Sequence, residues 1–588
     1  MDTVKRLFDI PQYQLEHNQL ETAFATKYNG EWKPTSTQEY IEKANLLSRY
    51  LSHIGIKKDD KIAIITNRSR TEWHIADIAI MQVGAQSVPI YDSTSKIDLK
   101  YIFNHAEVKY CFVANKELFD KLQQVDTKYL KEVFSFDKIN DCLSLEELIY
   151  KGREYKNQAL IDYIKLSIKP TDLATIIYTS GTTDKPKGVM LSHENIISNM
   201  IASSKAVPDF NDDEPRALSL LPVSHIFERM MLYLYQYNGI QIHFAESIET
   251  VADNMKEVKP HIMTVVPRLL EKIHDKIIDK GASLGIIKKK LFNWALDLGY
   301  KFEPFGKNGK SYEKSLKRAR KLIFSKWKEV FGGQIKVIFC GSSKLEPKLS
   351  RIFNAAGIPV MDGYGLTETS PVISVNSPND FGLRIGSIGK PIENVYVKIA
   401  DDGEILSKGP NNMLGYYKNS IKTESTFIDG YFKTGDLGRL DEDGFLYITG
   451  RKKETFKTSG GKYINPSKIE SELKKSLFIE QVMVIGENEK FPAAIIQPNF
   501  SLLRQTFSLN SINEELILNE LVISKIQEEV NFVNEQLGQW EKIKEIGLTP
   551  EEWTISSGHL TPTMKIKKDI IKSKYYYLYN KIYRPNLF

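Results

Sequence analysis

The stretch YTSGTTDKPKGV, which begins at Tyr178, has the composition of a phosphate-binding loop. It follows the apolar run LATII, which is typical of a strand. Gly181 and Gly188 would let the backbone turn, so that successive N–H groups point at one anion. Hydroxyl groups and positive charge add further donors at Thr179, Ser180, Thr182, Thr183, Lys185 and Lys187.

The pattern LSHENIISNMI predicts a helix directly after this loop, with Ser192 as N-cap and Asn195 in its first turn. A strand, a flexible loop and a helix N-terminus form a phosphate-binding layout. The loop is not a Walker A motif, because that motif needs Gly-Lys five residues after its first glycine, and Pro186 stands there. A solvated turn is the alternative interpretation, since Gly, Pro, Asp and Lys are common in turns.

Two further polar turns are expected at strand ends. In MDGYGLTETSP, we expect Asp362, Gly363, Tyr364 and Gly365 to form a tight turn, with the Tyr364 ring able to stack on a base. Thr367 could donate to a phosphate oxygen, and Glu368 could hold Mg²⁺ through its carboxylate. The sequence CGSSKL adds a turn at Gly341, Ser342 and Ser343. Ligands of open α/β sheets gather at the carboxyl ends of strands, so the three turns favour one shared site over three structural turns.

Other candidate residues are ambiguous when taken singly. His225 in LPVSHIFERM has apolar neighbours, and such a histidine is more often a packed residue than a catalytic one. Asp436 lies in a Gly-rich turn and could hold ribose hydroxyls. The remaining candidates are Arg451, the turn Ser459, Gly460 and Gly461, and Lys565 in the Thr/Pro loop LTPTMK.

The bulk composition limits the class of protein. A chain of 588 residues, 41% hydrophobic and 26% charged, suggests several globular domains. A formal net charge of +6 is too dilute to argue for nucleic-acid binding. The three cysteines fit no metal spacing and are typical of reduced thiols. Without a signal peptide pattern or an apolar run of membrane-spanning length, we expect a cytoplasmic protein with at most peripheral membrane contact.

Short β-branched runs alternate with helical patterns over the first two-thirds of the chain, which predicts an α/β fold. We expect strands in the runs that begin at residues 61, 86, 108, 173, 240, 262 and 334. From about residue 395 the pattern changes to short strands with Gly and Asp turns, which indicates a small β subdomain. We expect a large N-terminal domain at 1–449, with that β subdomain at about 395–449, and a smaller mobile α+β domain at 450–588. A long helical region is expected at 512–539.

Residues 280–328 form a lysine-rich helical stretch that includes KGASLGIIKKKLFNWALDLGYKF. Its composition favours a solvated helical excursion with one apolar face. A surface for a membrane or a partner is the alternative.

In this order, four stretches resemble the AMP-forming acyl-CoA synthetases, a branch of the adenylate-forming ligases: YTSGTTDKPKGVMLSHEN, YGLTETSP, KTGDLGRLDEDGFLYITGRKKE and LTPTMKIK. The resemblance extends from about residue 38 to 571. The sequence LPVSHIFER and the two helical insertions are most similar to the long-chain fatty-acid branch.

The resemblance implies that a fatty acid, ATP and coenzyme A are the substrates. In the first step a carboxylate attacks the α-phosphorus of ATP, which gives an acyl-adenylate and pyrophosphate. Residues 180–187 would hold the β- and γ-phosphates, Glu368 would place Mg²⁺, and Thr367 would contact the α-phosphate. Asp362, Tyr364 and the turn at 341–343 would enclose adenine, Asp436 and Arg451 would bind ribose, and Lys565 would lie beside the reacting α-phosphate.

In the second step a thiol displaces AMP. The resemblance implies that the C-terminal domain turns about a hinge at Lys453, which withdraws Lys565 and brings 459–461 against the pantetheine arm. His225 matches a position beside the acyl group. At two positions this sequence has a residue type that differs from the family pattern in a way that affects the backbone. Ser342 stands where relatives often have a second glycine, and Gly450 stands where many have aspartate.

The resemblance leaves alternatives open. The acceptor could be a carrier-protein phosphopantetheine, the acid could be another carboxylate, or the chain could be a non-catalytic regulator that binds a nucleotide or acyl-CoA. The chain length of the acid and the oligomeric state cannot be predicted from the sequence.

Overall fold

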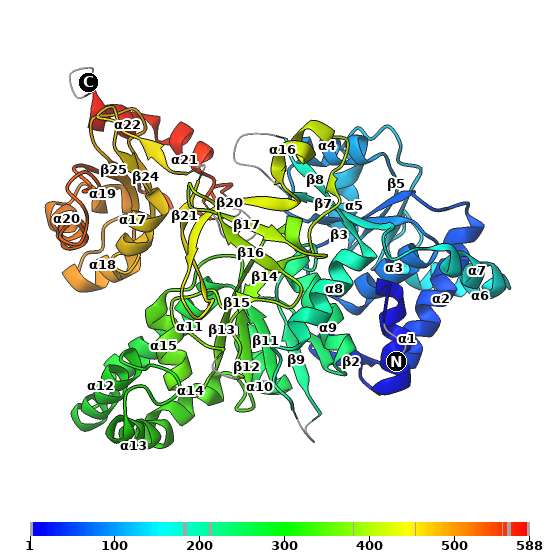
Figure 1. The fold of residues 1–588 in the computed structure, drawn as a ribbon, viewed down its shortest axis with the longest axis horizontal. Coiled ribbons are helices and arrows are strands. Elements are labelled where there is room, and N and C mark those ends of the chain that lie inside the picture. Colours follow the sequence, from blue (N-terminus) through cyan, green and yellow to red (C-terminus); the bar gives the residue numbers. More distant parts are fainter. Residues whose placement is uncertain are drawn as a thin grey trace. The chain divides into compact units, whose positions relative to one another are not determined.

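The structure is a computed structural model that describes residues 4–179, 185–210, 214–247, 249–379, 382–452, 454–554, 557–560 and 566–584. The chain divides into two compact units. The first comprises Met1–Lys398, Leu406–Lys433 and Leu440–Tyr447; the second comprises Ile399–Ile405, Thr434–Arg439 and Ile448–Phe588. Figure 1 labels their elements in chain order.

A seven-stranded sheet and a nine-stranded sheet form the framework of the first unit. The seven-stranded sheet is parallel from β6 to β7 and ends in two antiparallel strands. Its strands, in spatial order, are β18 (Gly415–Tyr416), β8 (Lys187–Ser192), β7 (Leu173–Thr179), β4 (Gln86–Tyr91), β3 (Lys61–Thr66), β5 (Val108–Val113) and β6 (Glu132–Ser135). The central strands are buried on both faces, which is why they read as continuous apolar runs.

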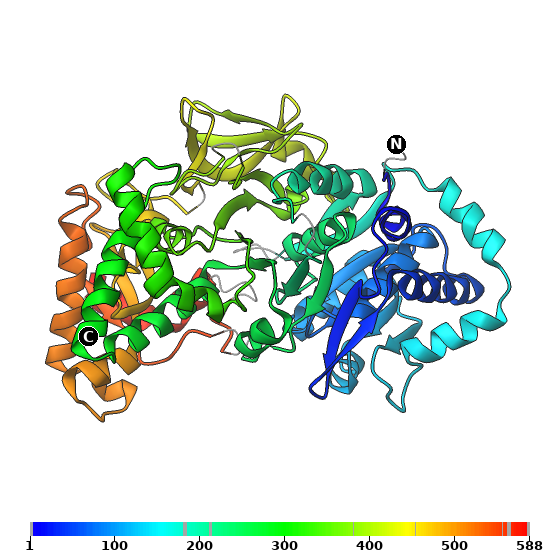
Figure 2. The same cartoon turned by 90° about the horizontal axis from the view of Figure 1, so that it is seen from below.

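The nine-stranded sheet is parallel from β13 to β1 and has antiparallel strands at its edges. Its strands, in spatial order, are β15 (Lys390–Pro391), β14 (Val372–Val375), β13 (Val360–Gly365), β12 (Val337–Cys340), β11 (Ile262–Val265), β9 (Arg216–Ser219), β10 (Gln241–Phe244), β1 (Phe24–Tyr28) and β2 (Glu31–Thr35). The hairpin of β1 and β2 extends from the sheet edge and is drawn in dark blue in Figure 2.

Helices cover these sheets. Two of them, α3 (Thr71–Gln82) and α9 (Ile226–Tyr237), are buried at nearly every position, so they lie inside the unit and not on its surface. The other helices of the first unit outside residues 267–355 are α1 (Ile10–His17), α2 (Thr37–His53), α4 (Lys96–Ala106), α5 (Lys116–Gln123), α6 (Leu145–Glu154), α7 (Gln158–Ser167), α8 (His193–Ser204), α10 (Val251–Val258) and α16 (Ser420–Thr426).

A helical arm, which we define as residues 267–330, leaves the nine-stranded sheet after β11. It contains α11 (Pro267–Ala282), α12 (Ile286–Tyr300), α13 (Lys310–Ala319), a π-helical turn (Arg320–Phe324) and α14 (Ser325–Val330). Helix α12 packs on α15 (Pro347–Ala355), and α15 packs on β13. Figure 1 shows α12 and α13 on the far side of α15 from these strands.

A third sheet has the order β16 (Tyr396–Ile399), β17 (Glu404–Lys408), β20 (Tyr431–Leu440) and β19 (Phe427–Ile428), with β21 (Leu446–Arg451) paired to β20. From β22 onward, the second unit is α+β. Its strands are β22 (Phe456–Lys457), β23 (Tyr463–Ile464), β24 (Ile479–Ile485), β25 (Ala493–Pro498) and β26 (Ile546–Leu548). Its helices are α17 (Pro466–Leu473), α18 (Phe500–Phe507), α19 (Asn513–Leu516), α20 (Glu520–Asn534), α21 (Lys568–Lys574) and α22 (Tyr576–Tyr583).

The predicted α/β class is confirmed, and so are the strands expected at residues 61, 86, 108, 173, 240, 262 and 334. The long helical region expected at 512–539 is present as two helices. The backbone leaves α19 after Leu516, and α20 starts after its N-cap Asn519, whose side chain accepts a hydrogen bond from the Leu521 N–H.

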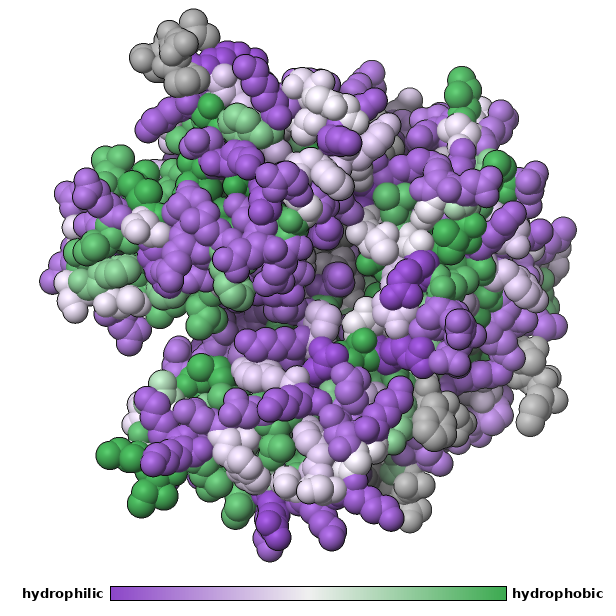
Figure 3. All heavy atoms as spheres, turned by 60° about the vertical axis from the view of Figure 1, so that its left-hand side comes forward, coloured by the Kyte–Doolittle hydropathy of each residue, from purple (hydrophilic) through white to green (hydrophobic). Residues whose placement is uncertain are grey.

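No helix in the described part of the chain combines the length and the apolar character that a membrane span requires. On the face drawn in Figure 3, hydrophobic side chains form patches that hydrophilic side chains separate.

Candidate active site

The carboxyl ends of four parallel strands meet at one edge of the nine-stranded sheet. Cys340 of β12 is in register with Asp362 of β13, and the Gly341 N–H donates to the Val265 carbonyl of β11 at 3.2 Å. Strand β9, which ends at Ser219, is the next neighbour of β11. The predicted meeting of the Gly341 turn with the segment at Asp362 is therefore present.

The first turn of α9 contacts this edge. His225 is the N-cap, and its Nδ1 accepts a hydrogen bond from the Phe227 N–H at 3.2 Å. This bond leaves Nδ1 unprotonated. The Phe227 ring lies against Gly341, where an added Cβ would be 3.1 Å from ring carbons Cε1 and Cζ. The missing Cβ lets this turn approach α9 closely, and the contact places the first turn of α9 next to the expected adenine turn.

Glu228, the next residue of α9, is completely buried and ties the helix to two strands. Its carboxylate oxygens accept from the Ser219 hydroxyl of β9 and the Thr264 hydroxyl of β11, each at 2.5 Å. Burial raises the pKa of the Glu228 carboxyl to about 7, although both hydrogen bonds act in the opposite direction. The sequence did not indicate this residue as functional, because a buried glutamate looks the same in sequence as an exposed one.

Arg229, also completely buried, ties α9 to the seven-stranded sheet. Its guanidinium donates to Asp77 Oδ1 of α3 at 2.7 Å, to Ser87 Oγ of β4 at 2.9 Å and to Thr175 Oγ1 of β7 at 2.8 Å. The Tyr233 hydroxyl donates to the other Asp77 oxygen. A buried charge is tolerated when it is paired and fully hydrogen-bonded, which these contacts achieve.

The phosphate-loop sequence lies in a β-hairpin, which corrects two predictions. Thr179 of β7 pairs with Lys187 of β8, so a strand and not a helix follows the loop. Helix α8 starts six residues later, where Ser192 caps it as predicted and forms a capping box with Asn195. Gly188 does not turn the chain: it lies within β8, where a Cβ would be 2.8 Å from Ile176 Cγ2. Ser180, Gly181, Thr182 and Thr183 lie outside the described residues.

Two pairs of aromatic and basic side chains lie at the base of this hairpin. The Tyr178 hydroxyl is 2.7 Å from His105 Nδ1, and the Lys185 ammonium lies 5.4 Å from the centre of the Tyr101 ring. These contacts fix the strand end from which the loop begins.

The segment expected to turn at Asp362 is a strand. Residues 362–365 belong to β13, residues 363–365 pair with β14, and the turn lies at Leu366–Pro371. Gly365 is required for close packing, since a Cβ would lie 1.7 Å from the Pro371 carbonyl oxygen. Burial raises the pKa of the Asp362 carboxyl, whereas Gly363 and Tyr364 are partly exposed.

Ser342 has φ = 69°, a left-handed conformation that favours glycine. This explains why relatives often have glycine at the position. Ser342 therefore adopts a conformation that costs free energy in the turn that also contains Gly341 and Ser343.

Glu368 lies in a 3-10 turn (Thr367–Thr369), and two contacts fix it. The Tyr416 hydroxyl donates to Glu368 Oε1 at 2.9 Å, and the Glu368 carbonyl accepts from the Met413 N–H at 2.8 Å. Burial and the neighbouring carboxylate raise the pKa of Tyr416, so the phenol keeps the proton that it donates. No group of three or more His, Cys, Asp or Glu side chains among the described residues forms a metal site. An ion at Glu368 would therefore need oxygens from elsewhere, such as nucleotide phosphates.

Two buried asparagines clamp this turn, and the sequence analysis missed both. Asn199 of α8 donates to the Val372 carbonyl at 2.7 Å, and its Oδ1 accepts from the Val372 N–H at 3.2 Å. Asn411 donates to the carbonyls of Thr369 at 3.0 Å and Val372 at 3.2 Å. Asparagine is normally a surface residue. The one signal in the sequence for a buried role was the position of Asn199 among the apolar residues of the helix NIISNMI.

In the second unit, the predicted ribose pair is brought together. The Arg451 Nε–H donates to Asp436 Oδ1 at 2.8 Å, and the Asp436 N–H donates to Thr434 Oγ1 at 3.1 Å. The neighbouring Gly450 leaves room for Asn465, the N-cap of α17, because a Cβ at residue 450 would lie 2.1 Å from Asn465 Nδ2. An aspartate at residue 450 would therefore displace this cap.

Ion pairs fix the chain on both sides of the expected hinge. Lys452 contacts Asp402 and Glu404, with Nζ–O distances of 2.5 and 2.7 Å. Glu454 contacts Lys568 at 3.2 Å and accepts from the Ser467 hydroxyl at 2.8 Å. Burial alone would raise the pKa of Glu454, but the Lys568 charge and these hydrogen bonds lower it. Lys453 itself lies outside the described residues.

The turn expected to contact the pantetheine arm is exposed to solvent. Ser459, Gly460 and Gly461 form an exposed hairpin tip, in which Gly461 has φ = 79° and Gly460 has no atom near its absent Cβ closer than 4.0 Å. Lys565 lies outside the described residues, between Leu560 and Ile566, which form an isolated antiparallel bridge.

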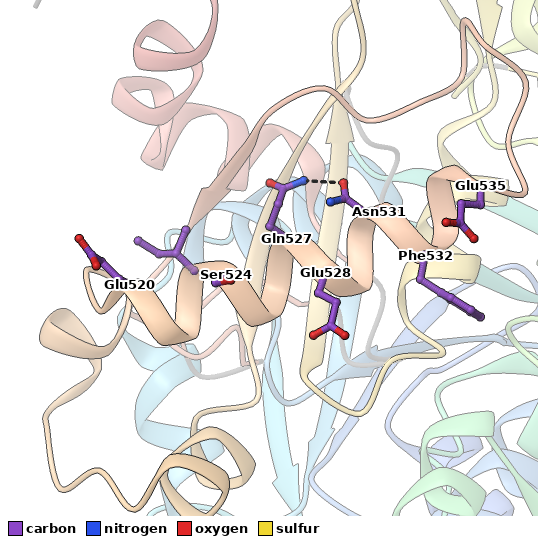
Figure 4. A pocket seen from close by; sticks show the side chains of 8 residues that line it. Glu520, Ser524, Gln527, Glu528, Asn531, Phe532 and Glu535 are labelled. Atoms are coloured by element: carbon purple, nitrogen blue, oxygen red, sulfur yellow. Dashed lines mark hydrogen bonds between the residues drawn. The ribbon is translucent and has the colours of Figure 1, made fainter.

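A hollow of about 640 Å³ along α20 is a different feature. Figure 4 shows its lining side chains, which include Glu520, Glu528 and Glu535. Three carboxylates would repel a nucleotide phosphate, and none of the predicted site residues lines this hollow. We therefore place the candidate site at the strand ends.

The buried Glu228 carboxyl predicts a pH dependence of stability. Its pKa is higher in the folded chain than the ordinary value of 4.5, so folding favours the protonated form. The free energy of unfolding should therefore fall as the pH rises from about 4.5 through about 7. Urea unfolding of the wild type and of Glu228→Gln across this pH range should show that the variant lacks this decrease in the free energy of unfolding. Equal slopes would contradict the assignment.

Two family models match most of the chain between them. A family model described as AMP-binding enzyme matches residues 13–417, and one described as AMP-binding enzyme C-terminal domain matches residues 453–584. The long-chain-fatty-acid–CoA ligase FadD15 of Mycobacterium bovis is 30% identical over 557 residues, which cover 93% of this chain and 92% of its own. Long-chain-fatty-acid–CoA ligase 5 of Rattus norvegicus is 32% identical over 581 residues, which cover 92% and 83%.

Solved structures share the fold. The o-succinylbenzoate coenzyme A synthetase of Bacillus subtilis, in complex with ATP and magnesium ion, has a TM-score of 0.67 at 19% identity and covers 95% of this chain and 98% of its own. A Mycobacterium tuberculosis fatty acyl CoA synthetase has a TM-score of 0.61 at 20% identity and covers 97% and 98%. Because the first family model matches more than half of the sequence, the chain belongs to the AMP-binding enzymes, the adenylate-forming superfamily that includes the acyl-CoA synthetases.

Proposed function

We propose that this protein is a long-chain fatty-acid–CoA ligase, which converts a fatty acid, ATP and coenzyme A into acyl-CoA, AMP and pyrophosphate. The names of its relatives, at 30–32% identity over nearly the whole chain, support this proposal. The observation that carries it is the meeting of the first turn of α9, through Phe227, with the Gly341 turn and the Asp362 strand end at one sheet edge.

In the first step a fatty-acid carboxylate oxygen attacks the α-phosphorus of ATP, and the bond from that phosphorus to the pyrophosphate oxygen breaks. An anion attacks a polyanion, so fixed positive charge and hydrogen-bond donors must offset the repulsion. We assign the hairpin loop from Ser180 to Lys187 to the leaving pyrophosphate, and Thr367 to the α-phosphate. Mg²⁺, when bound with ATP, would be held by Glu368 and would neutralise phosphate charge. Lys565 would stabilise the charge that develops at the α-phosphorus.

Other residues are assigned to the base and the ribose of adenosine. We assign Tyr364, Asp362 and the turn at 341–343 to adenine. Asp436 would accept hydrogen bonds from the ribose hydroxyls. Arg451 would fix the Asp436 carboxylate through the ion pair described above.

In the second step the sulfur of coenzyme A attacks the acyl carbonyl carbon, and the phosphate oxygen of AMP leaves. We assign Ser459, Gly460 and Gly461 to the pantetheine arm and Lys453 to the hinge. Because Lys452 and Glu454 are each held by ion pairs, a change of backbone torsion between them would move one anchored group relative to the other. The proposal also includes peripheral contact with the inner membrane surface from the cytoplasmic side.

The Lys565→Ala variant tests this assignment. Formation of acyl-adenylate from palmitate and ATP should fall by about 100-fold or more, because the charge at the α-phosphorus is no longer stabilised. Thioester formation from supplied acyl-AMP and coenzyme A should persist. For the wild type, release of AMP, with acyl-CoA formed only when coenzyme A is present, identifies the ligase.

Three outcomes would contradict the proposal. ADP as the product would indicate a kinase. Absence of turnover would favour a nucleotide- or acyl-CoA-binding regulator. Equal loss of both half-reactions in Lys565→Ala would contradict the proposal that the C-terminal domain turns between the two steps and withdraws Lys565.

The asparagine clamp gives a second prediction. Asn199→Ala should free the turn that carries Glu368, and the Mg²⁺ concentration needed for half-maximal adenylation should rise by about tenfold. The loss of its hydrogen bonds to Val372 should also lower the free energy of unfolding by about 1–3 kcal/mol.

Asn354→Ala is the matched control. Asn354 is also buried and donates to two backbone carbonyls, those of Ser350 and Val360, but it does not contact the Glu368 turn. It should lose comparable stability with an unchanged Mg²⁺ requirement. A parallel rise in both variants would show that the effect of Asn199→Ala is one of general stability.

A further inference from the structure

The positive charge of the chain is concentrated in the helical arm at 267–330. This arm has 17 Lys and Arg and 7 Asp and Glu, a formal net charge of +10. The rest of the chain has 63 Lys and Arg and 67 Asp and Glu, so its net charge is −4. The net charge of +6 therefore conceals a strongly basic arm on an otherwise slightly acidic protein.

The arm ends in an exposed tip, which we define as residues 280–291. Every residue from Ala282 to Leu291 is exposed, and residues 280–296 contain no Asp or Glu. The basic side chains are Lys280, Lys288, Lys289 and Lys290. None of the four forms a salt bridge to an acidic residue within the described chain.

Large apolar side chains stand among these lysines. Ile286 is 78% exposed and Ile287 is 85% exposed, and Leu284 and Leu291 lie beside them at 37% each. Burial of an isoleucine side chain removes apolar surface from water and is favourable, so two exposed isoleucines forgo that stabilisation. Ile286 and Ile287 form the first turn of α12, directly after its N-cap Gly285.

The arm holds the tip rigidly. Its inner faces are part of an apolar core that includes Ile277, Phe292, Ala295 and Leu316. Gly281 at the end of α11 lies against the Phe292 ring, where a Cβ would be 2.1 Å from Cε1. The close contact brings α11 and α12 together, so the exposed tip is a fixed corner and not a loose loop.

We propose that the tip docks on an anionic lipid bilayer. Lysines would lie in the headgroup layer, where each basic residue contributes about 1 kcal/mol, and Ile286 and Ile287 would enter the acyl boundary. The combination of unpaired lysines with projecting aliphatic side chains favours a bilayer, because a bilayer offers anionic and apolar layers at adjacent depths. Of the two interpretations of the lysine-rich stretch, a solvated helical excursion and a surface for a membrane or a partner, we therefore favour the membrane surface, and this choice does not depend on the proposed reaction.

Co-sedimentation with vesicles tests the proposal, using the full chain without ATP, fatty acid or coenzyme A. The wild type should bind vesicles of phosphatidylcholine with phosphatidylglycerol much more tightly than vesicles of phosphatidylcholine alone. Binding should weaken as NaCl rises from about 0.1 M to about 1 M, because the Debye length falls from about 10 Å to about 3 Å.

Variants locate the surface. K288Q/K289Q/K290Q should weaken binding to the anionic vesicles on the order of 100-fold, and I286Q/I287Q by about tenfold or more. K288R/K289R/K290R keeps the charge and should bind as the wild type does. The matched control K57Q/K128Q/K138Q removes three exposed lysines outside the arm and should bind within about twofold of the wild type, because those positions are not at the tip.

Three results would overturn the proposal. These are equal binding to both kinds of vesicle, a K57Q/K128Q/K138Q variant as impaired as K288Q/K289Q/K290Q, and failure of the wild type to bind anionic vesicles. The last result would favour an acidic protein partner for the tip. Thermal melting of each variant separates surface effects from folding, since the substituted side chains are exposed and the melting temperature should not change.

Discussion

The buried Arg229 guanidinium is the interaction on which the site geometry depends. It joins α9 to α3, β4 and β7, so that one charged group connects a helix to the seven-stranded sheet. The residue before it, Glu228, joins the same helix to β9 and β11 of the nine-stranded sheet. Phe227 then contacts the Gly341 turn, and His225 caps the helix. Four of the five residues of the sequence HIFER thus fix one helix between two sheets.

This arrangement explains why polar residues are buried where apolar ones would stabilise the fold. A leucine at 229 would remove the cost of desolvating the guanidinium, but it could not set the distance between α9 and three separate elements through directional bonds. The asparagines at 199 and 411 act in the same manner on the turn that carries Glu368. In both places, hydrogen bonds to buried groups set the position of a backbone segment that the proposed chemistry uses.

Local patterns predicted much of this fold and part of the site. Buried parallel strands such as β3 and β5 are continuous apolar runs and were predicted within a residue or two, and so was the N-cap at Ser192. The strand β8 was missed because its sequence KGVMLS begins with Lys-Gly directly after a turn-like segment, which hid the hairpin. Glu228, Arg229, Asn199 and Asn411 were missed because their roles come from partners distant in sequence. Ser342 and Gly450, two departures from the family pattern, needed backbone angles and neighbouring atoms before they could be explained.

The central claim is that the Arg229 contacts position the adenylation site, and fatty-acid-dependent ATP–pyrophosphate exchange tests it. Asp77→Asn removes the charge that Arg229 pairs with, and Phe134→Ala removes a buried ring of β6 at the far edge of the same sheet. Each should lower the free energy of unfolding by about 3–5 kcal/mol. Both variants are assayed below their melting transitions. The exchange rate should fall by about tenfold or more in Asp77→Asn, because a small displacement of reacting groups can lower a rate by up to about 100-fold. In Phe134→Ala the exchange rate should stay near that of the wild type. Exchange that is unchanged in Asp77→Asn, or that falls equally in both variants, would contradict the claim.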